Sequence, residues 1–164
     1  MPSPGVRARV DRFWRAVRRL GEIRSAGVDA FLRDENLVDA AERNLQVAVE
    51  ALIDVCEALI SYMRWRTPRS YRDIGRVLRE EGVLSGEDAA TFEEAVRLRR
   101  ILVHNYVYIG PREVYEAAGK LREELVRVAV KALNYMRERG IDPRGSLPKS
   151  FGAHRGQRPQ AARP

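Results

Sequence analysis

The sequence predicts an all-α fold, an up-and-down bundle of about five helices. Apolar residues recur at intervals of three and four over several long stretches, which is the pattern of amphipathic helices. Serine–acid pairs, glycines and prolines separate these stretches, as expected at helix ends. No stretch shows the alternation of a convincing strand. The 164 residues suffice for one domain with a substantial core, and we assign 1–139 to a helical domain and 140–164 to a flexible basic tail.

Two amphipathic segments make up the first part of the chain. The first carries an arginine-rich outer face and should end or bend near Gly27. The second, over residues 37–63, is the longest, and an additional apolar row widens its stripe enough to contact two neighbouring helices. Pro68 should end it. The main apolar rows are Val6, Val10, Phe13, Trp14, Val17 and Leu20 in the first segment, and Leu37, Ala41, Leu45, Ala48, Leu52, Cys56, Leu59 and Met63 in the second.

Two serine–acid pairs are typical of capping boxes. In such a box the serine Oγ accepts a first-turn N–H, and the acidic side chain reaches back toward the cap. Ser70 with Asp73 should therefore begin a short third helix. Ser85 with Asp88 should begin a longer fourth one. Capping explains Asp73 better than a catalytic role does.

Gly110 and Pro111 mark the start of the last predicted helix. Proline suits the first helical position because its missing N–H would have no partner there. The apolar period then continues over residues 114–135 and vanishes after Gly140. Glycines and prolines are frequent beyond that point, which indicates the flexible tail. The apolar run over residues 107–109 is too short to count as a strand.

The positive charge lies at the two ends of the chain. Residues 1–24 carry seven arginines against two acids, and 140–164 carry five basic residues against one acid. Since the whole chain has a net charge of +7, residues 25–139 are slightly acidic. Basic ends suit a polyanionic partner such as RNA. They equally suit a solubilising or nonspecific arm, so the charge alone does not identify a partner.

Several kinds of site are disfavoured by composition. The single cysteine, Cys56, excludes an intrachain disulfide, and we expect it in the core. Two distant histidines and one cysteine do not supply a zinc site, and no pattern calls for a metal or cofactor. The chain shows no apolar run of membrane length and no signal-like N-terminus, so we expect a cytoplasmic protein that does not contact membranes.

The candidate catalytic residues are Arg99, His104 and Tyr106. A histidine can accept or donate a proton near neutral pH, and an arginine can stabilise the charge that develops on a phosphate. A tyrosine can donate a hydrogen bond or a proton. Together they could cleave a phosphodiester without a metal. The pattern also fits a basic helix end that carries a solvated histidine and tyrosine, so spacing alone leaves both interpretations open.

Helix geometry restricts how these groups could meet. On an unbroken helix, residues five apart are rotated by about 140° and residues two apart by about 200°, so Arg99, His104 and Tyr106 would splay. Arg100, four before His104, would share its face. Either the helix ends or distorts near Val103, or a second copy of the chain completes the site, or the motif is not a site. The apolar residues 101–103 should be core anchors that fix where the polar groups point.

The stretch 99–106, Arg-Arg-Ile-Leu-Val-His-Asn-Tyr, resembles the signature of HEPN-domain proteins of the HepT type. These are the toxin halves of HEPN–nucleotidyltransferase toxin–antitoxin pairs. The similarity extends over about residues 30–135, including the helix around 41–50 and the entry to the short helix from Pro68 to Tyr71. It implies a HEPN-like helical bundle that forms a homodimer, with the two motifs lining a shared cleft.

The resemblance also implies an activity. HepT-like toxins of type II- or VII-like pairs are metal-independent ribonucleases, silenced when an MNT-like nucleotidyltransferase antitoxin adenylylates the motif tyrosine. The catalytic residues would be Arg99, His104 and Tyr106, with Tyr106 also modified. The family commonly has Asn after the motif arginine, whereas this chain has Arg100. Arginine cannot accept a hydrogen bond, but it could add a phosphate contact.

Two other functions remain compatible with the sequence. The chain could be a HEPN-like dimer that binds a nucleotide, RNA or a partner protein without cleaving anything, because a fold does not imply activity. It could also be a structural adaptor that uses the apolar face of residues 37–63 as its interface. Trp65 and Tyr71 could stack on bases, although packing at helix ends explains them as well.

Overall fold

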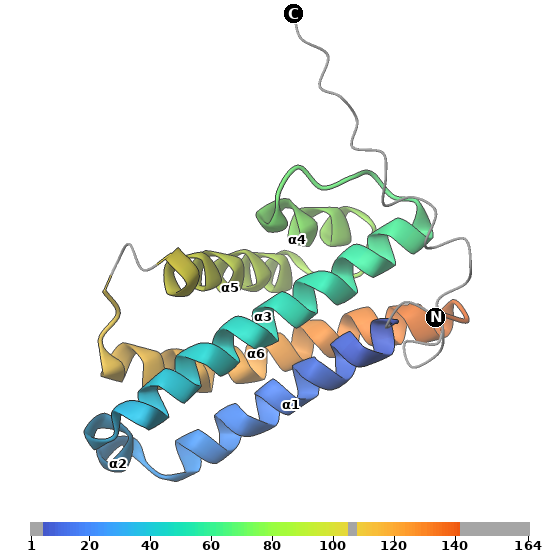
Figure 1. Ribbon diagram of the computed structural model, residues 1–164. Coiled ribbons are helices and arrows are strands. Elements are labelled where there is room, and N and C mark those ends of the chain that lie inside the picture. Colours follow the sequence, from blue (N-terminus) through green and yellow to red (C-terminus); the bar gives the residue numbers. More distant parts are fainter. Residues whose placement is uncertain (1–4, 105–107, 142–164) are drawn as a thin grey trace, which may run out of the picture.

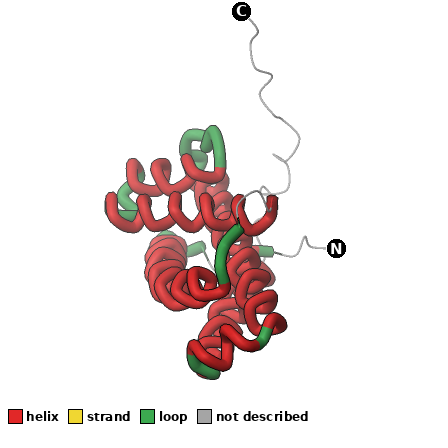
Figure 2. The backbone as a smooth tube through the Cα atoms, turned by 90° about the vertical axis from the view of Figure 1, so that its left-hand side faces the viewer, coloured by secondary structure: helices red, strands yellow, loops and turns green. Residues whose placement is uncertain are grey.

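The computed structural model describes residues 5–104 and 108–141, and within them the chain is helical. No described segment is a strand (Figure 2). The all-α prediction is therefore confirmed, with one short helix, α2, in addition to the five predicted segments. In chain order the helices are α1 (Val6–Ser25), α2 (Val28–Arg33), α3 (Glu35–Met63), α4 (Tyr71–Glu80), α5 (Gly86–His104) and α6 (Pro111–Glu138).

Helix α3 is the centre of the bundle. It contacts each of the other five helices. In Figure 1 it lies along α1 and α6, while α4 and α5 cover its other side. The start of α1 and the end of α6 lie at the same end of the molecule. Because the wide apolar stripe of α3 is covered within the fold, it offers no free face for the adaptor hypothesis.

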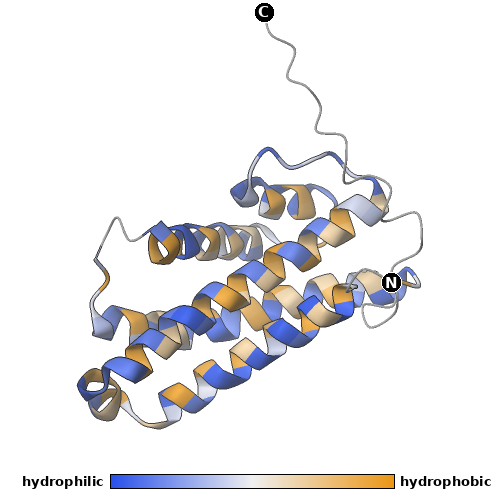
Figure 3. Cartoon of the chain, in the orientation of Figure 1, coloured by the Kyte–Doolittle hydropathy of each residue, from blue (hydrophilic) through white to orange (hydrophobic). Residues whose placement is uncertain are grey.

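The amphipathic pattern of α1 places its apolar side chains in the core as predicted. Val6, Val10, Phe13 and Leu20 are buried, and the polar positions alternate with them along the helix (Figure 3). The helix continues five residues beyond the predicted row, to Ser25. The φ angle of Gly27 is 88°, a left-handed conformation that suits glycine, and the chain turns there into α2.

Both serine caps are present, but one acid contacts a different partner from the one expected. The Asp73 N–H donates to Ser70 Oγ at 3.3 Å, as a capping box requires. The Asp73 carboxylate, however, accepts the N–H of Arg69 at 2.9 Å, one residue before the cap. It also accepts from Arg66 Nη1 at 2.7 Å. The Asp73 carboxylate therefore binds two residues of the preceding loop, Arg66 and Arg69, and does not reach back to the N–H of Ser70.

The second cap forms part of an ion cluster around the buried carboxylate of Asp88. The Asp88 N–H donates to Ser85 Oγ at 3.1 Å, and the Asp88 side chain is 2% exposed. Arg127 on α6 donates to Asp88 Oδ1 at 2.7 Å, and Lys131 pairs with its other oxygen. The capping pattern predicted the helix start. The two cations from α6, about forty residues away, attach α5 to α6.

The free cysteine lies in the core. Cys56 is fully buried on α3, as expected, and burial raises the pKa of its thiol to about 12. Such a thiol is protonated at neutral pH and is not a nucleophile. Within residues 5–104 and 108–141, no helix is both long and apolar enough to cross a membrane.

Candidate functional site

The motif arginine is held between three helices. Arg99 on α5 donates from Nε and Nη2 to Glu50 Oε1 on α3, at 3.3 and 3.2 Å. Gln46, one turn earlier on α3, donates to the same oxygen at 3.0 Å. The Arg99 guanidinium carbon lies 5.6 Å from the ring centroid of Tyr71, the first residue of α4. Glu50 thus accepts three hydrogen bonds and fixes the direction of the guanidinium.

This arrangement leaves Nη1 of Arg99 without a hydrogen bond to a described residue. The side chain is 22% exposed. A half-buried, oriented guanidinium stabilises a phosphate better than a mobile one, because little side-chain entropy remains to be lost. The Glu50 carboxylate neutralises Arg99 in the free protein without covering that nitrogen.

The motif histidine is the last residue of α5, and its side chain is exposed. The helix ends at His104, one residue after Val103, as one of the three explanations predicts, and it is continuous from Arg99 to His104. On this helix the two residues are about 7.5 Å apart along the axis and rotated by about 140°. Tyr106 lies outside the described residues. No distortion of α5 brings Arg99 and His104 together, and completion of the site by a second copy of the chain stays a prediction.

The apolar residues of the motif are only partly in the core. Leu102 is half-buried and packs against it, as predicted for a core anchor. Val103 is 39% exposed, so its prediction as an anchor is wrong. It lies next to His104 at the helix end, where the neighbouring elements leave it uncovered. After the gap in the described residues, Tyr108 is 85% exposed. This end of α5 therefore presents apolar surface beside the motif.

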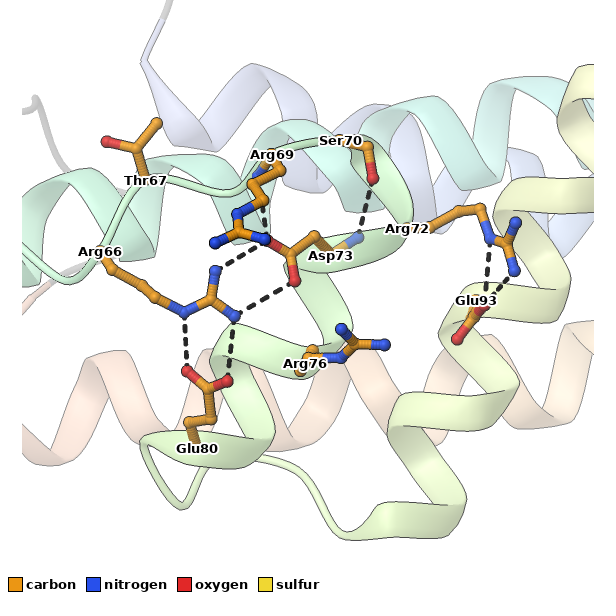
Figure 4. Close-up of a pocket in the computed structure, with 9 residues that line it drawn as sticks. All are labelled: Arg66, Thr67, Arg69, Ser70, Arg72, Asp73, Arg76, Glu80 and Glu93. Atoms are coloured by element: carbon orange, nitrogen blue, oxygen red, sulfur yellow. Dashed lines mark hydrogen bonds and ion pairs between the residues drawn. The ribbon is translucent and has the colours of Figure 1, made fainter.

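A hollow of about 720 Å³ lies beside the start of α4. Sequence reasoning missed it, although six arginines among residues 64–79 were the available signal. Figure 4 shows the side chains that surround it. They are Arg66, Thr67, Arg69, Ser70, Arg72, Asp73, Arg76, Glu80 and Glu93.

Among the described residues, no group of three or more histidine, cysteine, aspartate or glutamate side chains is placed to hold a metal ion. The charged groups at the start of the motif are instead two arginines. Arg99 is paired with Glu50. Arg100 is exposed and makes no hydrogen bond or ion pair with a described residue. Such groups can bind and polarise a phosphate directly.

The helix order and the motif at the end of α5 define an all-helical domain of the HEPN-like class. A family model described as ribonuclease HepT-like matches residues 14–132, and the chain belongs to this family. That span contains all three candidate catalytic positions. No curated protein matches the sequence.

Solved structures with the same fold include a toxin–antitoxin complex with AMP-PNP, at 21% identity and a TM-score of 0.70, covering 79% of this chain and 98% of that one. An AMPylated HEPN toxin of Shewanella oneidensis in complex with an MNT antitoxin has 21% identity and a TM-score of 0.72, covering 81% and 98%. YutE of Bacillus subtilis, a cytosolic protein of unknown function, has 19% identity and a TM-score of 0.70, covering 83% and 91%.

Proposed function

We propose that this protein is a metal-independent endoribonuclease, the toxin of a toxin–antitoxin pair, and that it acts as a homodimer. The observation that carries the proposal is the ribonuclease HepT-like match over residues 14–132, which spans the motif arginine, histidine and tyrosine. The fixed orientation of Arg99 supports it, because the guanidinium keeps one nitrogen available beside the half-exposed Tyr71.

The chemistry assigns one role to each group. His104 of one copy removes the proton from the ribose 2′-OH, Arg99 of the other copy completes the same site, and water supplies the proton that the leaving 5′-oxygen takes up. Arg99 stabilises the nonbridging oxygens as negative charge develops on them. Tyr106 orients the phosphate or the histidine. Arg100, which shares the His104 face of α5, adds a second phosphate contact in place of the usual asparagine.

The shape of α5 supports a homodimer. The helix is unbroken from Arg99 to His104, so one chain does not bring the two groups together by distortion. Val103 and Tyr108, 39% and 85% exposed, would be covered if two copies met at this end of the helix. Such a contact would also bring the two motifs to one cleft.

Wild-type protein should cleave single-stranded RNA in the presence of EDTA and leave a 2′,3′-cyclic phosphate, because the 2′-OH is the nucleophile and no metal takes part. His104→Ala should reduce the rate by about 10²–10⁴-fold. The measurement is denaturing electrophoresis of a labelled oligonucleotide, with the cyclic product identified by mass. The same oligonucleotide with 2′-deoxyribose should stay intact, and its cleavage at an equal rate would contradict the mechanism.

A second candidate, a HEPN-like dimer that binds without cleaving, is favoured by one observation. Arg100 replaces the asparagine common in the family, and an arginine cannot accept the hydrogen bonds that an asparagine can. The cleavage assay separates the two functions. A chain that binds RNA but leaves it intact, in the wild type as in His104→Ala, is the binder.

We further propose that a nucleotidyltransferase of the MNT type silences the protein by transferring AMP from ATP to the Tyr106 hydroxyl, with release of pyrophosphate. The AMPylated Shewanella toxin in complex with its MNT antitoxin supports this partner. Wild-type protein should gain the mass of AMP when incubated with the nucleotidyltransferase and ATP, and should lose ribonuclease activity. Tyr106→Phe should gain no mass, since it lacks the acceptor oxygen. Equal modification of Tyr106→Phe and wild type would contradict the assignment of this residue.

A further inference from the structure

The segment of residues 64–79, which we call the arginine segment, is a strongly basic part of the described chain that the proposed mechanism does not use. It carries six arginines and a single acid, Asp73. It comprises the loop after α3 and most of α4, and it supplies most of the wall of the hollow (Figure 4). Since α4 packs against α5, the hollow lies on the side of the bundle that also carries Arg99.

Part of this positive charge is neutralised within the protein. Arg66 donates from Nε to Glu80 at 2.8 Å and from Nη1 to Asp73 at 2.7 Å, and its Nη2 contacts both acids. The hydrogen bonds from Arg66 lower the pKa of both carboxyls, that of Asp73 well below its usual value. Arg72 pairs with Glu93 of α5 in the same way. Each of the three acids in the wall therefore already binds a guanidinium.

Two arginines of the wall are not bound to an acid, although the charge of Arg76 helps to lower the pKa of Asp73 and Glu80. The side chains of Arg69 and Arg76 line the hollow, are exposed, and make no hydrogen bond or ion pair with a described residue. A guanidinium matches the geometry of a phosphate, to which it can donate two parallel hydrogen bonds. The paired acids hold the wall in place while these two cations stay available to an anion in the hollow.

Tyr71 lies next to the wall of the hollow in the chain and contacts the motif arginine. Its chain neighbours Ser70 and Arg72 line the hollow, and its own ring lies 5.6 Å from the Arg99 guanidinium. The ring is 47% exposed. Trp65, the other aromatic residue of the arginine segment, instead packs against Tyr135 in the core. Tyr71 is thus an exposed aromatic group that contacts Arg99 and is flanked in the chain by two residues that line the hollow.

A row of cations with an exposed aromatic ring between them is how proteins bind single-stranded nucleic acid: the cations contact backbone phosphates and the ring stacks on a base. We propose that the hollow is a second phosphate subsite for the RNA strand, in which Arg69 and Arg76 bind a backbone phosphate next to the one at Arg99 and Tyr71 stacks on the base between them. This inference rests on the proposed ribonuclease function. It implies that the RNA substrate binds as an extended single strand.

The test measures binding without cleavage. In the full-length His104→Ala chain, the fluorescence anisotropy of a labelled 12-nucleotide single-stranded RNA should report a Kd that rises roughly 10- to 100-fold when Arg69→Ala and Arg76→Ala are added. The slope of log Kd against log salt should fall by about 0.7, since the two arginines bind one phosphate and each phosphate contact with a single strand contributes about 0.7. Tyr71→Ala should raise Kd roughly 5- to 150-fold and leave the salt slope unchanged, because stacking releases no counterions.

The matched control removes the same charge elsewhere. Arg15 and Arg19 on α1 are exposed, make no ion pair with a described residue, and do not line the hollow. Arg15→Ala with Arg19→Ala should change Kd by less than about threefold, since only the long-range field is altered. An equal loss in both double variants would show a general charge effect and overturn the subsite, as would unchanged binding in the Arg69/Arg76 variant. Thermal unfolding of each variant checks that it is folded.

The outcomes also separate this inference from the proposed function. If the wild type cleaves RNA but the Arg69/Arg76 pair affects neither binding nor cleavage, the subsite is wrong and the ribonuclease stands. If the wild type fails to cleave, the ribonuclease is wrong, while the binding series still decides whether the hollow holds RNA. Loss of nucleotidyltransferase binding with unchanged RNA binding would identify the hollow as a protein contact and overturn the RNA subsite.

Discussion

Mixing the Arg99→Ala chain with the His104→Ala chain should restore RNA cleavage that neither chain has alone. Each single variant loses a group that acts on the reacting phosphate, and we expect rates lower by about 10²–10³-fold for Arg99 and 10²–10⁴-fold for His104. The mixture should recover about a quarter of the wild-type activity. In a symmetric dimer half of the mixed molecules are heterodimers, and each heterodimer has one site with both groups intact.

The expectation depends on the two groups coming from different chains. Arg99 is tied to Glu50 on α3, while His104 lies five residues further along the same unbroken helix. If Arg99 and His104 acted within one chain, every site in the heterodimer would lack one of them and the mixture would stay inactive.

The Glu50→Gln variant tests the orientation of Arg99, since it keeps the arginine but weakens the contact that orients it. It should lower kcat by about tenfold and change KM little.

The measurement is the initial rate of cleavage after the two chains are unfolded together and refolded, so that subunits exchange. Each variant refolded alone is the control for residual activity, and light scattering establishes the dimer. A mixture no more active than its components would contradict the shared site. Full activity in the Arg99→Ala chain alone would contradict the role of the arginine itself.

The sequence predicted the helices well where the apolar period was long. The 29 residues of α3 and the 28 of α6 repeat the pattern over many turns, so both were found with small errors at their ends. The six residues of α2 were missed because they bury one apolar side chain, Phe31, which packs against Tyr115 of α6. A single buried residue gives no period, and only the tertiary contact makes this segment a helix.

The candidate site was predictable only in part, because its key contacts join residues that are far apart in the sequence. The motif itself was read from its spacing, but the Glu50 partner of Arg99 lies 49 positions earlier. The hollow depends on which arginines are neutralised, and Glu93, which pairs with Arg72, is 21 residues away. Nothing in the local pattern distinguishes Arg66, which is fully paired, from Arg69, which is not. Tertiary structure alone makes that distinction.

Asp88→Ala should destabilise the fold by about 3 kcal/mol, because it removes the buried carboxylate that Arg127 and Lys131 bind. The Asp88 side chain is 2% exposed, while the side chains of Arg127 and Lys131 are 43% and 41% exposed. Once the aspartate is gone, water can therefore solvate both cations, which keeps the cost below that of a fully buried pair. In a domain of this size we expect the melting temperature to fall by roughly 6–12 °C.

The loss of stability caused by Asp88→Ala should depend on pH. Burial raises the pKa of Asp88, but hydrogen bonds from Lys131, Arg127 and Ser85 outweigh it and lower the pKa to about 2. Because the folded state lowers the pKa, the stabilisation is complete above the unfolded value near 4 and is lost as the pH falls toward 2. Urea unfolding at pH 7 and at pH 3 should therefore show a smaller difference between wild type and Asp88→Ala at the lower pH.

An exposed ion pair between the same two helices is the matched control for Asp88. Glu94 on α5 lies 3.7 Å from Lys120 on α6, with side chains 52% and 60% exposed. Glu94→Ala should change the free energy of unfolding by less than about 0.5 kcal/mol, because a solvated pair gains little. Equal effects of the two substitutions would show that burial of Asp88 contributes nothing, and that α5 is attached to α6 by its apolar contacts alone.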